Sequence, residues 1–313
     1  AAAEAIAPVL EKGNLVVLES TSPVGTTEKM AKWMAKLRPD LSFPHDKGGM
    51  ADISLAHCPE RVLPGKILEE VVNNARVIGG MTRKCAQRAL SLYRIVVQGD
   101  CKVTNARTAE MSKLTENAYR DVNIAFANEL SVICDKHKIN VWELIQMANL
   151  HPRVNILSPG PGVGRHCIAV DPWFIVDGAP EEARIIRMAR IINDAKPGFV
   201  CDKVAERAKS LVKPVIACLG LSYKADVDDL RESPALEIVA QLAGMSVGKL
   251  LVVEPHVSSL PRELTDLGLE LTDFDQALEQ ANMVLLLVDH SAFMHIDRDV
   301  IKDKIIVDTR GAW

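Results

Sequence analysis

The sequence predicts an α/β protein in which two regions of alternating strands and helices flank a helical middle third. Apolar runs of strand length alternate with helical patterns in residues 1–105 and again in residues 212–313. This alternation is typical of a parallel sheet covered by helices. Residues 106–211 instead repeat apolar side chains at three- and four-residue spacing, which is typical of amphipathic helices.

In the first region, a helical-looking AAAEAIAPVL precedes strands predicted at residues 15–18, 53–56 and 76–78. Helices are predicted at residues 26–37 and 83–96. A dinucleotide-binding half normally begins with a strand, a GxGxxG turn and a helix, and this sequence contains no such turn. We therefore expect this region to be the later part of a Rossmann-like domain that begins upstream of the first residue.

The middle region should begin with one long amphipathic helix at residues 107–138, a segment without Gly or Pro. A shorter helix at 141–150, a loop rich in Pro and Gly, and a helix at 180–208 should follow. The apolar stripe of the long helix consists of Met111, Leu114, Ala118, Val122, Ala125, Phe126 and Leu130.

The last region resembles a second Rossmann-like unit. Ser233 before Pro234 marks a helix start, because serine can cap free N–H groups and proline suits the first helical position. Strands are predicted at residues 215–219, 250–253, 284–288 and 305–307, and helices at 234–243 and 274–280.

The composition is that of a globular protein, with 48% hydrophobic and 25% charged residues. The net charge is −4 and no long basic run occurs, so we expect no nucleic-acid partner and no anionic membrane partner. The apolar runs are too short to cross a bilayer. Seven scattered cysteines without a CxxC pair favour reduced thiols in a cytoplasm over a disulfide framework or a zinc site, and we expect no bound metal.

Cys167 stands in the segment PGPGVGRHCIAVD, residues 159–171. Glycine removes side-chain bulk, so a ligand can approach a thiol closely in such a loop. That arrangement suits a nucleophile. A small buried hydrophobe, the commonest fate of a free cysteine, is an equally weighted interpretation of this loop alone.

Further candidate groups lie on the long helix and after predicted strands. Lys113 and Asn117 are four residues apart, so they share one helix face and could stabilise an oxyanion and orient a water. A solvated pair is the alternative. Ser20, Thr21, Glu60, Arg61, Lys224 and Arg231 follow strands, at the edge where α/β sheets bind ligands; a surface ion pair in a turn is the alternative for Glu60 and Arg61.

The ordered motifs STSPVGTTE, CPERVLPG, EMSKLTENAYRDVNIAFANE, PGPGVGRHCIAVDP and GLSYKADVDDLRESPA resemble the UDP-sugar 6-dehydrogenase family, which includes UDP-glucose and GDP-mannose dehydrogenases. The resemblance covers essentially the whole chain. HPRVNILSPGPGVG followed by HCIAVDPWFIV is most similar to the branch that oxidises UDP-N-acetyl-D-mannosamine for bacterial polysaccharide biosynthesis. Val170 stands where UDP-glucose enzymes usually carry a lysine.

The resemblance implies a partial NAD-binding Rossmann-like domain (1–105), a central helical dimerisation domain with the catalytic Lys and the Cys loop (106–211), and a UDP-sugar-binding Rossmann-like domain (212–313). It implies a cytoplasmic homodimer that oxidises the sugar C6 alcohol to a carboxylate. Two NAD are consumed, and the sugar passes through a cysteine thiohemiacetal and thioester.

Residue roles are carried over by motif. The catalytic set is Cys167 as nucleophile, Lys113 at the oxyanions, Asn117 and Asp171 at the water, and Thr21 and Glu60 in proton handling. The substrate-binding set is Arg61, Arg153, His166, Lys224 and Arg310, with Arg153 reaching a partner subunit's site. The cofactor-binding set is Ser20, Thr21 and Arg231.

Two departures from the family pattern lead to further expectations. Without the glycine-rich turn, the chain should be a truncated form that binds NAD poorly and lacks activity. Arg165 stands where the family generally has glycine, and it would either strain the nucleophile loop or add an anion contact. The alternatives are a sister UDP-N-acetylglucosamine or UDP-glucose dehydrogenase, or a non-enzymatic UDP-sugar-binding dimerisation module.

Overall fold

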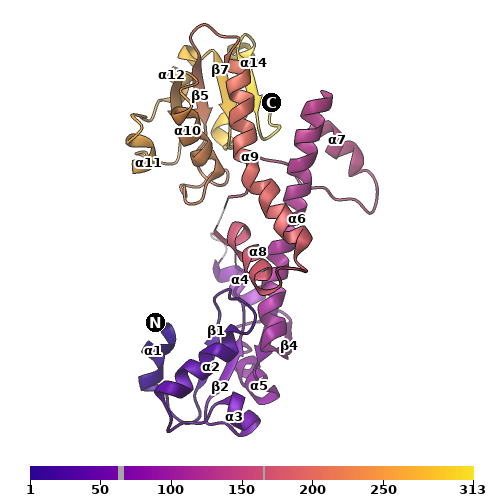
Figure 1. Cartoon of the computed structure of the whole chain (residues 1–313), viewed down its shortest axis with the longest axis vertical. Coiled ribbons are helices and arrows are strands. Elements are labelled where there is room, and N and C mark those ends of the chain that lie inside the picture. Colours follow the sequence, from indigo (N-terminus) through magenta and orange to yellow (C-terminus); the bar gives the residue numbers. More distant parts are fainter. Residues whose placement is uncertain (63–66, 165) are drawn as a thin grey trace. The chain divides into compact units, whose positions relative to one another are not determined.

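The computed structural model describes residues 1–62, 67–164 and 166–313 (Figure 1). The chain forms two compact units. Residues 1–118 and 171–183 make up the first unit, and residues 119–170 and 184–313 make up the second. Each unit contains a four-stranded sheet. The expectation about Arg165 falls outside the described residues.

The first sheet has the order β1-β2-β3-β4. Three of its strands are predicted by apolar runs in the sequence, but the sheet is not wholly parallel as expected. β2 and β3 pair antiparallel, through Ala56 with Gly80 and His57 with Gly79, because the chain re-enters the sheet from the end at which β2 leaves it. The strands are β1 (Leu15–Leu18), β2 (Ser54–His57), β3 (Arg76–Gly80) and β4 (Cys101–Asn105).

Helices cover the first sheet. α2 (Thr26–Leu37) places Met30 and Met34 against Phe43 and Leu55 in the apolar core of this unit. The other short elements are α1 (Ala2–Ile6), η1 (Ala7–Val9), α3 (Pro44–Lys47), η2 (Gly48–Met50), α4 (Ile67–Asn73) and α5 (Arg83–Tyr93).

The middle of the chain is helical, as predicted. α6 (Ala106–His137) matches the predicted long helix within one residue at each end. α7 (Val141–Ala148) begins at Asn140, whose side chain accepts the backbone N–H groups of Trp142 and Glu143. α9 (Arg184–Ala208) begins four residues later than the predicted 180.

The loop prediction for residue 167 is wrong. The segment 159–164 is irregular, but α8 (His166–Gly178) begins directly after it, so Cys167 lies in the first turn of a helix. The glycines and prolines of residues 159–164 favoured a loop, but the helix begins just after them and contains Pro172. A proline inside a helix removes one backbone hydrogen bond, and α8 nevertheless continues to Gly178.

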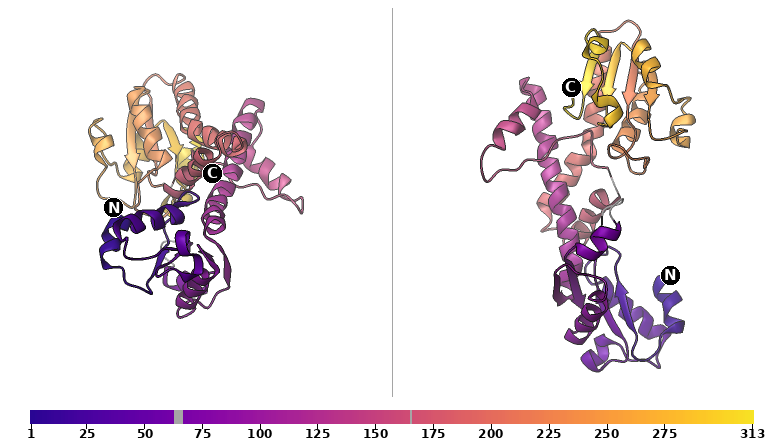
Figure 2. Two further views of the ribbon diagram at one scale, coloured as in Figure 1. Left: turned by 60° about the horizontal axis from the view of Figure 1, so that its bottom comes forward. Right: turned by 180° about the vertical axis from the view of Figure 1, so that it is seen from behind.

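The second sheet is wholly parallel, in the order β6-β5-β7-β8, and Figure 2 shows its arrows near the C-terminus. The strands are β5 (Val215–Leu219), β6 (Lys249–Val253), β7 (Met283–Leu286) and β8 (Ile305–Asp308). The helices are α10 (Pro234–Gly244), α11 (Arg262–Thr265), α12 (Phe274–Gln280), α13 (Ser291–Met294) and α14 (Arg298–Ile301).

Both faces of the second sheet are buried. Along β5, Ile216 and Cys218 enter one apolar cluster, whereas Ala217 and Leu219 enter another, as the alternation of strand side chains requires. The strand order reverses between β5 and β7. Ligands of such sheets bind beyond the carboxyl ends of the strands at this switch point. We therefore expect the segments that follow β5 and β7 to contain the binding residues.

Candidate active site

The loop after β1 is fixed by a buried carboxylate. Glu110 of α6 accepts the backbone N–H groups of Gly25 at 2.5 Å and Thr27 at 2.8 Å, together with the Thr27 hydroxyl at 2.7 Å. Glu110 therefore caps the start of α2 from another element. Ser20 and Thr21 precede this cap, and their hydroxyl groups have no protein partner among the described residues.

Glu60 and Arg61 both have ion-pair partners, but they do not form the surface ion pair with each other that was the alternative interpretation. Glu60 accepts the N–H groups of Arg61 and Val62, and its other oxygen lies 2.8 Å from Nη1 of buried Arg76. Burial acts to raise the pKa of Glu60, but the hydrogen bond and charge of Arg76 outweigh it and hold the pKa below its usual value. Arg61 pairs in turn with Glu116 of α6.

Asn117 and Asp171 meet within the first unit. Asn117 Nδ2 donates to Asp171 Oδ2 at 2.5 Å, and both side chains are buried. Lys113 lies one helical turn before Asn117, is half-buried, and has no hydrogen-bond or ion-pair partner among the described residues. The structure therefore brings together two of the predicted catalytic groups and leaves an amine available on the same helix.

In the second unit, a chain of buried amides holds the glycine-rich segment that precedes Cys167. Asn128 of α6 accepts the N–H of Gly160 at 2.9 Å and donates at 2.9 Å to Asn193 of α9. Asn193 in turn donates a hydrogen bond to the Asp121 carboxylate, which also accepts one from Arg190. The sequence did not reveal Asn128, Asn193, Asp121 or Arg190, because mid-helix polar residues look like exposed ones.

The glycine-rich segment, Lys224 and Arg310 line one small cavity of about 30 Å³, together with Tyr223 and Pro234. A Cβ atom at Gly164 would lie 2.9 Å from Tyr223 Cβ, and one at Gly160 would lie 2.8 Å from Arg310 Nη1. The close approach of Tyr223 therefore requires glycine at position 164, whereas the flexible Arg310 side chain near Gly160 could move aside. Two of the predicted substrate cations thus converge on the segment that leads to Cys167.

Cys167 is exposed. This exposure contradicts the interpretation of a buried small hydrophobe. By contrast, Cys58, Cys201 and Cys218 are buried, and burial raises the pKa of Cys58 to about 11 and those of Cys201 and Cys218 to about 12.

The remaining predicted residues are surface groups or lie outside the description. Arg153 is exposed in the segment after α7. Arg231 is 87% exposed, pairs with Asp229 at 2.7 Å, and lines an open cavity of about 940 Å³ between α9 and α10. The side chain of His166 is outside the described residues.

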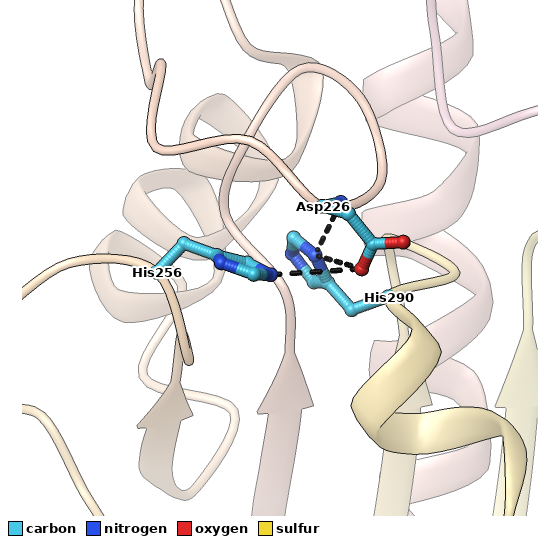
Figure 3. Close-up of side chains that lie close together, drawn as sticks. All are labelled: Asp226, His256 and His290. Carbon is cyan, nitrogen blue, oxygen red and sulfur yellow. Dashed lines mark hydrogen bonds and ion pairs between the residues drawn. The ribbon is translucent and has the colours of Figure 1, made fainter.

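A histidine cluster that the sequence analysis missed follows the strands of the second sheet (Figure 3). One ligand atom each from Asp226, His256 and His290 lies within 4.8 Å of the others. The sequence signal was available, because EPH directly follows β6 and DH follows soon after β7. These are the positions at which a doubly wound sheet carries its site.

Three domain profiles match the chain, and all describe one family. The NAD binding domain matches residues 1–97, the central domain residues 107–195, and the UDP binding domain residues 217–313. The chain belongs to the UDP-glucose/GDP-mannose dehydrogenase family. It is therefore an NAD-dependent nucleotide-sugar dehydrogenase, with a UDP-sugar as substrate.

The named relatives align with all or nearly all of this chain. An NDP-N-acetyl-D-galactosaminuronic acid dehydrogenase of Ralstonia nicotianae is 62% identical over 100% of this chain and 74% of its own length. A UDP-N-acetyl-D-mannosamine dehydrogenase of Campylobacter jejuni is 60% identical over 96% of this chain and 74% of its own length. The solved UDP-D-ManNAc dehydrogenase of Pyrococcus horikoshii is 39% identical, with a TM-score of 0.86 over 100% of this chain and 72% of that one.

These matches bear on two expectations. The first 97 residues match the family's NAD binding domain, so the expectation that this chain lacks an NAD-binding capacity is not supported, and the expected truncation stays a prediction. The family assignment also favours an enzyme over a non-enzymatic binding module. Among the described residues, none of the helices is both long enough and apolar enough to span a membrane.

The residues after β1 fit one part of NAD. The unpartnered hydroxyls of Ser20 and Thr21 can hydrogen-bond the polar groups of a ribose or a carboxamide. The start of α2 does not fit the pyrophosphate, because Glu110 already occupies its N–H groups with a negative charge. Among the described residues of this unit, Ser20 and Thr21 could therefore hold part of the cofactor.

Proposed function

We propose that this enzyme oxidises C6 of UDP-N-acetyl-D-mannosamine from the alcohol to the carboxylate and forms UDP-N-acetyl-D-mannosaminuronate. The observation that carries the mechanism is the exposed thiol of Cys167 at the start of α8, directly after the cation-lined glycine-rich segment. Relatives named for this sugar, from Campylobacter jejuni, Yersinia pestis and Escherichia coli, are 57–60% identical to the chain. They support the choice of substrate.

NAD, when bound, supplies the hydride acceptor for both oxidations. After the first oxidation the Cys167 thiolate adds to the C6 aldehyde, which forms a carbon–sulfur bond and an oxyanion. C6 again carries a hydrogen and an electron-rich oxygen, so a second hydride can leave and a thioester results. Water then cleaves the carbon–sulfur bond, which releases the carboxylate and the thiolate. One alcohol and one water thus give one carboxylate, two hydrides and three protons.

Lys113, Asn117 and Asp171 act on the oxygen atoms of this sequence. The ammonium of Lys113 stabilises the oxyanions that form when sulfur or water adds to C6. Asn117 holds Asp171 through the 2.5 Å hydrogen bond, and Asp171 takes a proton from the attacking water. Cys167 and Asp171 are four residues apart on α8, so helical spacing places both on one face.

Thr21 and Glu60 assist proton transfer in this proposal, with Thr21 the more direct of the two. The lowered pKa of Glu60 makes it a weak base. Its contacts with Arg61 and Arg76 support a second contribution, which is to hold Arg61 beside α6.

Lys224 and Arg310 provide positive charge for the UDP part. Both line the cavity beside the glycine-rich segment at the switch point of the second sheet. Arg61, Arg153 and His166 contact the substrate in this proposal, with Arg153 acting in a partner subunit's site, and Arg231 contacts the cofactor. Arg310 is oriented by Asp289, which lies 2.8 Å from its Nε.

We also propose a homodimer built on α6. Tyr119, Phe126 and Ile133 are exposed by 69%, 51% and 48% and recur every seven residues. Such spacing places them in one stripe along the helix. Met147 and Leu150 extend the exposed apolar surface at α7. Sedimentation of the chain as a monomer at micromolar concentration would contradict this assembly.

A second candidate substrate comes from the relative with 62% identity. Because that protein is named an NDP-N-acetyl-D-galactosaminuronic acid dehydrogenase, UDP-N-acetyl-D-galactosamine should be assayed beside UDP-N-acetyl-D-mannosamine, UDP-N-acetylglucosamine and UDP-glucose. The favoured outcome is the largest kcat/KM with the mannosamine nucleotide. Faster turnover of another sugar would assign the chain to that sister activity.

The mechanism is tested by replacing the thiol. Cys167→Ala should form no uronate and release at most one NADH per sugar, whereas the wild type should release two. Cys101→Ser, a half-buried cysteine of β4, is the matched control and should behave as the wild type. Undiminished uronate formation by Cys167→Ala would reject the covalent mechanism.

A further inference from the structure

The turn that follows β5, residues 221–226, carries Lys224 at the switch point of the second sheet. This turn has a costly backbone conformation. Asp226 has φ of 58°, in the left-handed region that residues other than glycine rarely adopt. Such a conformation persists only where the surrounding structure imposes it. The neighbouring side chains show what imposes it here.

Glu254 fixes the first half of the turn. Its Oε2 accepts the backbone N–H groups of Leu221 at 2.7 Å and Ser222 at 3.0 Å, and its Oε1 accepts that of His256 at 3.0 Å. The Glu254 carboxylate is fully buried. Burial acts to raise the pKa of Glu254, but the hydrogen bonds from His290 and from these N–H groups outweigh it and lower the pKa.

His290 fixes the second half of the turn. Its Nδ1 accepts the backbone N–H of Asp226 at 3.0 Å, and its Nε2 lies 3.1 Å from Glu254 Oε2. A backbone N–H can only donate, so Nδ1 is the acceptor and the ring proton lies on Nε2, directed at Glu254. Between these anchors, the Ser222 hydroxyl donates to the Lys224 carbonyl at 2.5 Å.

These hydrogen bonds decide between two interpretations of the cluster in Figure 3. Two imidazoles and a carboxylate could hold a divalent metal. The lone pair of His290 Nδ1 is already directed at a backbone N–H, however, and the Asp226 carboxylate accepts both the N–H and the hydroxyl of Ser291. A metal ion would have to displace these donors, so the contacts favour a hydrogen-bonded clamp.

We propose that Glu254 and His290, the clamp, are positioning residues for nucleotide binding, which hold the 221–226 turn in the shape that presents Lys224 to the diphosphate of the UDP-sugar. The proposal rests on the proposed function, in which Lys224 contacts the UDP part. Both side chains are buried, and their polar atoms contact the turn and each other. Apart from the bond from His256 N–H to Glu254 Oε1, the side-chain hydrogen bonds described for these two residues therefore shape the turn or join the two residues.

The test measures UDP binding by calorimetry and steady-state kinetics on the full chain. His290→Phe fills the same space but removes both hydrogen bonds, and it should weaken UDP binding and raise the KM of the sugar nucleotide by about tenfold. The KM of NAD and kcat should change by less than about twofold. The amide of Asp226 should also exchange faster with solvent. A merely structural role would not separate these kinetic constants.

Two variants serve as matched controls. His290→Asn places an acceptor near the position of Nδ1 and should recover most of the affinity for UDP. His256→Ala removes the half-exposed ring of the cluster, whose Nε2 lies 3.6 Å from Asp226, and should bind UDP like the wild type. If His290→Phe does not fold, Ser222→Ala, which releases the Lys224 carbonyl, should still weaken UDP binding.

The outcomes separate this proposal from the proposed function. A wild-type chain that does not bind UDP would refute the proposed function itself. Loss of UDP binding in Lys224→Ala, with unchanged affinity in folded His290→Phe and in Ser222→Ala, would leave that function standing and overturn the clamp. Weak binding by His290→Phe alongside normal binding by Lys224→Ala would also overturn it, because the clamp would then not act through Lys224.

Discussion

Asn117 donates a hydrogen bond of 2.5 Å to Asp171, and this bond ties α6 to α8 inside the first unit. A buried carboxylate oxygen without a hydrogen-bond donor would be costly, and Asn117 supplies the donor here. The same bond orients the base that the proposed hydrolysis requires. The stability of this pair and the last chemical step of the reaction are therefore linked.

Replacing Asn117 by Asp should slow the hydrolysis of the thioester. Two carboxylates would then share one buried site, and one of them would take up a proton. We expect kcat to fall by about a hundredfold, and rapid acid quenching should trap the sugar on Cys167, visible as a mass adduct. Asn123→Asp alters a partly exposed position of the same helix and is the control. An unchanged kcat without an adduct would argue against the assigned base.

Iodoacetamide should alkylate Cys167 before the buried thiols. Cys167 is exposed, whereas burial keeps Cys58, Cys201 and Cys218 protonated at neutral pH. Peptide mass spectrometry over a time course would measure the order of labelling, and a bound UDP-sugar should protect Cys167. Cys101, which is half-buried, provides the internal comparison. Earlier labelling of a buried thiol would contradict the description of this surface.

Glu110→Ala should lower both stability and NAD affinity. Three donors, the N–H groups of Gly25 and Thr27 and the Thr27 hydroxyl, would lose their acceptor. We expect a loss of roughly 2–3 kcal/mol in the free energy of unfolding, measured by urea titration, and a raised KM for NAD because the Ser20–Thr21 segment precedes this cap. Glu28→Gln, which loosens an exposed pair with Arg107, should change stability by less than about 1 kcal/mol.

Lys196 should make stability depend on pH in the alkaline range. Burial lowers the pKa of Lys196 to about 8, from a usual value of 10.5. Between these values the unfolded chain binds the proton and the folded chain does not, so stability rises with pH. The stability that the neutral amine of Lys196 allows is fully present above pH 10.5 and is lost as the pH falls through about 8.

The matching experiment compares Lys196→Met with the wild type at several pH values. The variant should be the more stable protein at pH 7, by at most roughly 3 kcal/mol, and this advantage should shrink as the pH approaches 10. Lys209→Met, at an exposed position, should show no such trend. A pH-independent difference for Lys196→Met would mean that the buried amine is not the titrating group.

Strands and helices with a strong apolar period were predictable from the sequence. β1, α2, β5 and α12 have the predicted bounds, because each joins a clear apolar pattern to a turn or cap signal. β4 was not predicted, since all of its residues are exposed or half-buried and three of the five, Lys102, Thr104 and Asn105, are polar. It pairs through its backbone with β3, and sequence patterns carry little information on such pairing.

The candidate site residues could be selected where their chemistry shows in a local motif. Residue type and motif resemblance selected Cys167, Lys224, Asn117 and Asp171, and their roles stay predictions. The clamp and the Asn128–Asn193 contact could not, because their partners lie 36 and 65 residues apart in the sequence. A hydrogen bond between two buried polar groups from different elements leaves no periodic pattern in the sequence. Only the fold reveals such partners.

The cap on α2 has a consequence for the order in which segments of the chain can fold. The first N–H groups of this helix find their acceptor 83 and 85 residues further along the polypeptide. During synthesis on the ribosome, the start of α2 therefore stays incomplete until Glu110 has emerged from the exit tunnel. Long-range closure of this kind slows folding, so the nascent N-terminal segment should depend on chaperones for longer than its short helices suggest.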